Sequence, residues 1–279
     1  MTRRLSRTPL LPLALLSLAA CGSPPAAPAA SPASPAHDAA APKPATAAAP
    51  APADPLGAKI DPLFARYAKP GVPGCALGVY RAGELVFARG YGEASLEHGL
   101  PIDAHTVFDV GSISKQFTAA AILLLAQDGK LSLDDDVRKY IPELPDFGRP
   151  IRIQHLLHHT SGLRDYAGLL MIDGFDDADL TDDQDALFVI EHQKKLNFPT
   201  GTAWSYSNTG YFLASILVKR VSGTTLAEFA KKRIFEPLGM TSTFYFDDHT
   251  RVVHDRATAY APRPDGSFGV AMSDFEQVG

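Results

Sequence analysis

The sequence predicts an α+β domain, because strand-like alternation near residue 80 is followed by several helix-like apolar segments. Residues 76–80 and 84–90 alternate around the turn at 81–83, which is typical of a β-hairpin. Residues 112–128 are almost entirely apolar after their start, which is typical of a buried helix. The formal net charge is −5 and no basic stripe is present, so we expect no nucleic-acid partner.

The first 21 residues have the pattern of an export signal. Arg3 and Arg4 precede the apolar stretch 10–18, which is too short to span a bilayer as a permanent helix. Small residues then lead into Cys21, and this arrangement is similar to a bacterial lipobox. We therefore expect residues 1–21 to be a lipoprotein signal peptide with Cys21 lipidated, holding an exported domain at the membrane in the periplasm or on the outer envelope. A plain secretory signal that happens to contain a cysteine is the alternative.

Residues 22–54 are rich in alanine and proline and show no apolar periodicity. Proline lacks a backbone donor and disfavours helix, so this segment is predicted to be a disordered, extended linker. A folded domain is then expected over residues 55–279.

The first elements of that domain follow from local periodicity. Ile60, Phe64 and Tyr67 recur at helical spacing, so a helix is expected before the hairpin. A further short strand is predicted at 106–110. The apolar helix from Ser112 should end at Asp128-Gly129, and its apolar surroundings predict that its start is buried as well.

Later segments alternate between helices and loops. We expect short helices within 131–144 and 151–163, the second leading into a tight turn at Ser161-Gly162, and longer helices within 209–223 and 224–240. The acidic segment 173–185 is predicted to be a mobile loop, and residues 244–279 to be strands and loops.

Ser112 and Lys115 are the first candidate for catalysis. A serine needs a base to become a nucleophile, and a lysine three residues later lies on the same helix face. Backbone N–H groups at a helix start can also stabilise an oxyanion. The alternative is a serine cap followed by a solvated lysine, but a lysine in the first turn opposes the helix dipole.

Tyr206 and Asn208 form the second candidate, at the start of another helix. A tyrosine beside an ammonium group can have a lowered pKa and can carry a proton, while an asparagine can bind a substrate amide. The alternative is a helix cap beside a buried aromatic ring.

His155, His158 and His159 lie close together, but no further ligand stands at a spacing typical of zinc sites, so no metal is expected. Imidazole hydrogen bonds that stabilise a helix end and turn are predicted instead. Cys75 lies among small and apolar residues, which predicts a buried, unreactive thiol.

Four segments together, FDVGSISKQF, IRIQHLLHHTSGL, FPTGTAWSYSNTGYF and IFEPLGMTSTFY, resemble the serine hydrolases of the class C β-lactamase, D-alanyl-D-alanine carboxypeptidase and esterase group. The resemblance covers about residues 56–274. It implies a β-lactamase/transpeptidase-like fold, with an antiparallel sheet flanked by helices and a mostly helical subdomain. It also implies Ser112 as acylated nucleophile, Lys115 as its proton partner, Tyr206 as general base and acid, and Asn208 as a substrate contact.

The family's third motif, K-T-G or H-x-G, is not found after Tyr206. We therefore expect a C-terminally truncated chain that lacks further strands and half of the oxyanion hole. The expected function is that of an envelope-anchored, monomeric serine hydrolase without a cofactor, acting on a β-lactam, a peptidoglycan peptide or a small ester. A non-catalytic module that binds peptidoglycan or a partner is the alternative.

Overall fold

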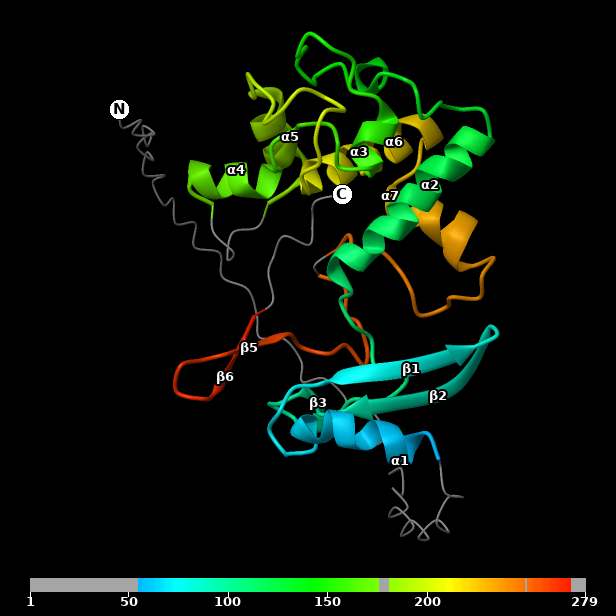
Figure 1. The fold of residues 1–279 in the computed structure, drawn as a ribbon, viewed down its shortest axis with the longest axis vertical. Helices are drawn as coiled ribbons and strands as arrows, with labels where there is room; N and C mark the ends of the chain where they lie inside the picture. Colours follow the sequence, from blue (N-terminus) through cyan, green and yellow to red (C-terminus); the bar gives the residue numbers. More distant parts are fainter. Residues whose placement is uncertain (1–54, 176–180, 249, 272–279) are drawn as a thin grey trace, which may run out of the picture. The chain divides into compact units, whose positions relative to one another are not determined.

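The computed structural model describes residues 55–175, 181–248 and 250–271. The predicted signal peptide, the lipidated Cys21 and the linker 22–54 lie outside the described residues. The described part has helices and small antiparallel sheets, which confirms the α+β class (Figure 1). No helix within it is both long enough and apolar enough to span a bilayer.

The predicted hairpin is present, with β1 at Cys75–Arg81 paired to β2 at Glu84–Tyr91 (Figure 1). Ala82 and Gly83 have φ of 49° and 84°, and two left-handed residues are what a tight two-residue hairpin needs. The predicted first helix is also present, as α1 at Gly57–Ile60 and a 3₁₀ helix at Asp61–Tyr67. It packs on β2 through stacking of Phe64 on Tyr91, with ring centroids 4.4 Å apart.

Two further small sheets follow this hairpin in the described part of the sequence. β3 at Glu93–Ser95 pairs with β4 at Leu100–Pro101, and β5 at Tyr260–Pro262 pairs with β6 at Phe268–Val270. The Thr258 N–H donates to the Ala94 carbonyl, so the segment before β5 lies beside β3. Strands and loops were predicted for residues 244–279, and the described part of this range confirms them.

The prediction of a strand at 106–110 was wrong. Among the described residues, a single bridge forms there, between Val107 and Arg256. The Asp103 carboxylate accepts hydrogen bonds from the backbone N–H groups of His105 and Thr106. This side chain folds the backbone into a turn in place of an extended strand.

The apolar helix forms as α2, Lys115–Gln127, after a 3₁₀ turn at Gly111–Ser114. It ends where predicted, with Gly129 at a φ of 70°. The predicted burial of this helix is confirmed only in part, because Ile122 and Leu125 are fully buried while Leu123 is 51% exposed. The start of the segment is exposed at Ser112, so the predicted burial of this end was wrong.

The longest helix of the described residues, α6 at Asn208–Ser222, lies at the centre of the helical part and packs against α2, α3 and α7 (Figure 1). α3 spans Ile153–Leu157, and α7 spans Leu226–Ala230 and continues into a π-helical turn. All three helices lie in segments predicted to be helical. At Gly210 a methyl group would stand 2.8 Å from the Leu156 carbonyl oxygen, so α6 approaches α3 backbone to backbone.

A mobile loop was predicted over the acidic segment 173–185. Residues 176–180 lie outside the described residues, and helices extend into both ends of the described part. α4 covers Tyr166–Asp173 and α5 covers Asp183–Glu191. The Asp182 carboxylate accepts hydrogen bonds from two backbone N–H groups in the first turn of α5. The acidic residues that suggested a loop therefore act in part as a helix cap and as favourable charges at a helix start.

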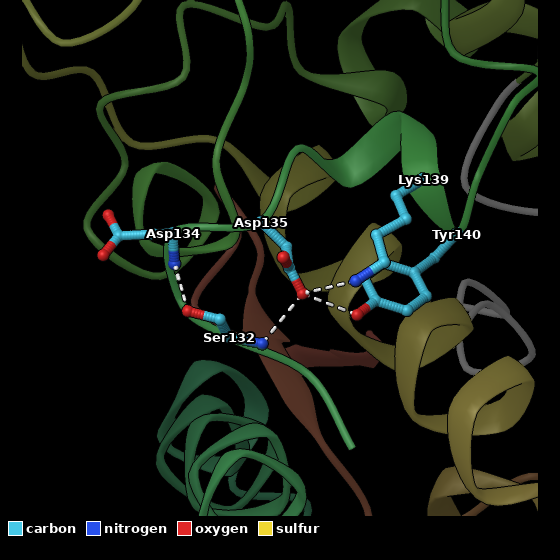
Figure 2. Close-up of polar contacts among 5 residues, drawn as sticks. All are labelled: Ser132, Asp134, Asp135, Lys139 and Tyr140. Atoms are coloured by element: carbon cyan, nitrogen blue, oxygen red, sulfur yellow. Dashed lines mark hydrogen bonds and ion pairs between the residues drawn. The ribbon is translucent and has the colours of Figure 1, made fainter. Parts of the chain in front are cut away.

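The loop after α2 is held by Asp135 (Figure 2). One carboxylate oxygen accepts the Ser132 N–H at 2.9 Å, the Tyr140 hydroxyl at 2.6 Å and the Lys139 ammonium at 3.2 Å. These hydrogen bonds lower the pKa of Asp135 to about 2. The predicted short helix of this segment is the 3₁₀ helix Val137–Lys139.

Gly210→Ala should destabilise the protein, although alanine favours helix by about 1 kcal/mol over glycine. The added methyl group overlaps the Leu156 carbonyl, and overpacking of this kind costs about 1–3 kcal/mol. Gly168→Ala in α4 is the matched control, because nothing lies within 4 Å of its methyl position. Urea unfolding should show a lower midpoint for the first variant and an equal or higher one for the second. Equal midpoints for the two variants would contradict the close approach.

Candidate active site

Ser112 lies in the 3₁₀ turn that precedes α2, and its side chain is exposed. Its Oγ is 2.6 Å from the Tyr206 hydroxyl and accepts a hydrogen bond from Lys115 Nζ at 3.0 Å. The serine does not cap α2, because the residue before α2 is Ser114, and that residue makes no side-chain cap bond. Its hydroxyl is therefore directed at two groups that can exchange a proton with it.

The turn that carries Ser112 is fixed on both sides. Gly111 has a φ of 51°, and its N–H donates to the Asp109 carboxylate at 2.7 Å. On the other side the Tyr245 hydroxyl donates to the Ser114 carbonyl at 3.1 Å and lies 2.8 Å from the Thr118 hydroxyl. The nucleophile candidate is thus placed by backbone contacts that do not involve its own side chain.

Lys115 connects the two predicted motifs. Its ammonium donates to Ser112 Oγ and to Asn208 Oδ1, each at 3.0 Å. It also lies over the aromatic rings of Tyr206 and Tyr211, 5.1 Å and 5.7 Å from their centroids. The structure therefore brings together Ser112, Lys115, Tyr206 and Asn208, the four residues singled out from the sequence.

The electrostatics at Tyr206 favour loss of its proton. Partial burial raises the pKa of the phenol, but hydrogen bonding to Lys115 and Ser112 and the positive charge of Lys115 outweigh it. The net pKa lies below the ordinary value of a tyrosine. The phenolate that this lowered pKa favours can accept a proton from the serine that touches it. Tyr206 is 44% exposed, so it is not the buried aromatic ring of the alternative interpretation.

Asp165 was not recognised from the sequence, although it fixes the second motif. Its carboxylate accepts the backbone N–H of Asn208 and also those of Ala167 and Gly168 at the start of α4. It therefore ties the first turn of α6 to the first turn of α4. An aspartate directly before a helix is a recognised cap signal, but its second role across the chain has no local signature.

Thr209 completes this connection and was also missed. Its hydroxyl donates to the Arg164 carbonyl at 2.7 Å and accepts the Tyr166 N–H at 2.8 Å, and its side chain is fully buried. Together, Asp165 and Thr209 hold the backbone of the Tyr206–Asn208 motif against the loop that follows α3.

The histidines form hydrogen bonds at the helix end and turn, as predicted. His155 Nδ1 accepts the Arg152 N–H at 3.1 Å, and His159 Nδ1 accepts the Ser207 N–H at 3.2 Å. Burial lowers the pKa of both imidazoles, and the charge of Lys115 lowers that of His159 further. Among the described residues, no cluster of three or more His, Cys, Asp or Glu side chains could hold a metal ion.

Trp204 lies at the edge of the cluster, beside His159. Trp204 is 65% exposed and lies edge-on to the His159 ring, with centroids 6.1 Å apart.

Cys75 is a free thiol on β1. It is half-buried, whereas a buried thiol was predicted, and burial raises its pKa. A raised pKa disfavours the thiolate, as expected for an unreactive cysteine.

Lys115→Met should raise the pKa of Tyr206, because the lowering hydrogen bond and charge are lost while burial remains. The measurement is NMR titration of ¹³Cζ-labelled tyrosine, with Tyr206→Phe for assignment. Lys139→Met is the matched control, since Lys139 lies 5.0 Å from the centroid of another tyrosine ring, that of Tyr140. A Tyr206 pKa that is unchanged in Lys115→Met would contradict the electrostatic interpretation.

Curated relatives with matching sequences include D-aminopeptidases and penicillin-binding proteins. The chain is 34% identical over 224 residues to a D-aminopeptidase of Gluconobacter oxydans, covering 80% of this chain and 41% of the relative. It is 33% identical over 180 residues to penicillin-binding protein 4* of Bacillus subtilis, covering 64% and 39%. The chain thus spans about two-fifths of the length of these relatives.

Solved structures agree with this relationship. The octameric penicillin-binding protein homologue of Pyrococcus abyssi superposes with a TM-score of 0.70 at 31% identity, covering 81% of this chain and 52% of that one. The D-amino acid amidase of Ochrobactrum anthropi, solved with L-phenylalanine amide, gives 0.65 at 26%, covering 77% and 60%. The monomer expected for this chain stays a prediction.

The family model described as Beta-lactamase matches residues 60–278, which is most of the chain. That range contains every residue of the hydrogen-bonded cluster around Ser112. It also agrees with the resemblance expected from the sequence motifs. This chain belongs to the Beta-lactamase family of serine hydrolases.

Proposed function

We propose that this protein hydrolyses amide bonds through an acyl-enzyme formed on Ser112. One observation carries the proposal: Ser112 Oγ contacts both Tyr206 and Lys115, and Lys115 also binds Asn208. A serine hydroxyl becomes an effective nucleophile when a base within hydrogen-bond reach removes its proton. This cluster offers such a base and a fixed positive charge beside it.

In the proposed first step, Ser112 Oγ attacks the carbonyl carbon of the substrate and its proton passes to the Tyr206 phenolate. The Lys115 ammonium stabilises the phenolate before this transfer. Tyr206 then gives the proton to the leaving nitrogen as the C–N bond breaks, which leaves an ester on Ser112. Water attacks that ester with Tyr206 again as base, and the acid product leaves with Ser112 reprotonated.

Asn208 is suited to bind the substrate. Its Oδ1 is occupied by the Lys115 ammonium, so the amide NH₂ is left to donate to a substrate carbonyl. This arrangement also fixes which way the amide group points. In the proposed complex the same lysine therefore orients both the nucleophile and the substrate contact.

The substrate class we propose is an amide or short peptide of a D-amino acid. It is supported by the names of the relatives, which include D-aminopeptidases and a D-amino acid amidase. Penicillin-binding proteins among the relatives make peptidoglycan peptides and β-lactams further candidate acyl donors. Small esters could acylate Ser112 by the same chemistry, so they are also candidate substrates.

A fluorophosphonate probe and a fluorescent penicillin should label wild-type protein, and Ser112→Ala should lose labelling by about 10³-fold or more. Ser114→Ala is the matched control in the same turn, because the Ser114 hydroxyl donates to the Gly111 carbonyl away from the cluster. Ammonia release from D-phenylalanine amide should exceed that from the L-enantiomer.

No labelling of the wild type, with a labelled positive control, would overturn the acyl-enzyme. Peptidoglycan binding that survives Ser112→Ala without any turnover would instead support the non-catalytic module.

We also propose that the protein is exported and anchored through lipid on Cys21. The lipobox-like sequence before Cys21 and the alanine- and proline-rich segment after it support this. Wild-type full chain should incorporate labelled palmitate and sediment with membranes, and Cys21→Ser should do neither. Cys75→Ser is the matched control, since these are the only two cysteines. Lipid labelling that persists in Cys21→Ser would contradict the anchor.

A further inference from the structure

We propose that His159 is a positioning residue that holds the Tyr206 ring and the backbone after it in the arrangement that contacts Ser112. The proposal deepens the proposed function and rests on it. His159 belongs to the turn after α3, and its side chain makes two separate contacts with the Tyr206–Asn208 motif.

The first contact is with the Tyr206 ring. The imidazole stacks on it with centroids 4.7 Å apart and an interplanar angle of 29°. Tyr206 is 44% exposed, so few other groups restrict its ring. Lys115 lies over the same ring but binds the serine and Asn208 through its ammonium. A flat partner such as the imidazole limits tilting of the phenol away from Ser112.

The second contact is with the backbone. The Ser207 N–H donates to His159 Nδ1 at 3.2 Å, which requires that this nitrogen carries no proton. Ser207 is the residue before α6, so its N–H has no partner within the helix. A protonated imidazole could not accept this hydrogen bond, and the support would be lost.

The conformation of His159 itself indicates that the position is constrained. Its φ is 57°, in the left-handed region that is uncommon for residues other than glycine. Such conformations persist where the surrounding structure holds them. Its neighbour His158 has a φ of −93° and an exposed side chain, although the two residues share the same type and the same turn.

The surroundings of His159 favour the neutral ring that the second contact needs. Three charged or titratable groups face it: Lys115 from α2, Tyr206 from the loop before α6, and Tyr211 from α6. The ring centroids of Tyr211 and His159 are 5.3 Å apart. Burial and the positive charge of Lys115 lower the pKa of the imidazole below its ordinary value. The neutral form therefore persists to a lower pH than in an exposed histidine.

Two variants separate the contacts without imposing backbone strain. His159→Asn tolerates the left-handed conformation and keeps an acceptor oxygen, but removes the ring. His159→Gly fits the conformation and removes both contacts. His158→Asn is the matched control. All are made in the full chain, and circular dichroism checks that each folds.

The rate constant for fluorophosphonate labelling of Ser112 should fall by about 10- to 100-fold in His159→Gly, less in His159→Asn, and not in His158→Asn. The pH profile gives the decisive difference. The wild-type rate should show an added acidic limb, at a pH below the ordinary pKa of an imidazole, as His159 gains a proton. His159→Asn should lack this limb because an amide does not titrate there. Unchanged rates and an unchanged acidic limb in both His159 variants would overturn the proposal.

A readout without turnover separates this proposal from the proposed function. Loss of the stacking partner frees Tyr206 from Lys115 and Ser112, so NMR of ¹³Cζ-tyrosine should show its pKa rising in His159→Gly. If wild-type Ser112 is never labelled, the acyl-enzyme fails, and His159 is still judged by this titration. A Tyr206 pKa identical in wild type and His159→Gly would overturn the positioning role even if labelling is normal.

Discussion

The active-site cluster depends on two backbone N–H groups at the start of α6. Those of Ser207 and Asn208 are accepted by His159 and Asp165, both from the loop that follows α3. A helix start always leaves such donors without internal partners. Here their partners come from a distant segment, so one set of hydrogen bonds satisfies the start of the helix. The same bonds fix the direction of Tyr206, which contacts Ser112, and of Asn208, which binds Lys115.

The cluster joins two segments that are 94 residues apart at Ser112 and Tyr206. Because Ser112 and Tyr206 are both exposed, water screens charges here more than in a buried site. Short contacts of about 3 Å therefore matter more than the long-range field. The structure provides them by fixing both turns through neighbouring groups, Asp109 and Tyr245 on one side and Asp165 on the other.

Much of this could be predicted from sequence, because it depends on local patterns. The hairpin, the end of α2 at Gly129 and the helical character of α6 follow from alternation, a glycine cap and apolar periodicity. The contacts of Asp165 and Thr209 could not be predicted, because each joins residues more than 40 positions apart through single side chains. The loop prediction for the acidic segment 173–185 failed in part for a related reason, because an aspartate suits a loop and a helix cap equally well.

Trp204 gives the protein an unusual optical property. It is the only tryptophan in the chain, it is 65% exposed, and its nearest described aromatic neighbour in a ring contact is His159. Its fluorescence therefore reports the rim of the cluster and carries little information about the core around α2 and α6. Far-UV circular dichroism reports those helices instead. A difference between the two melting curves would measure local opening at the rim, and it would not by itself indicate a folding intermediate.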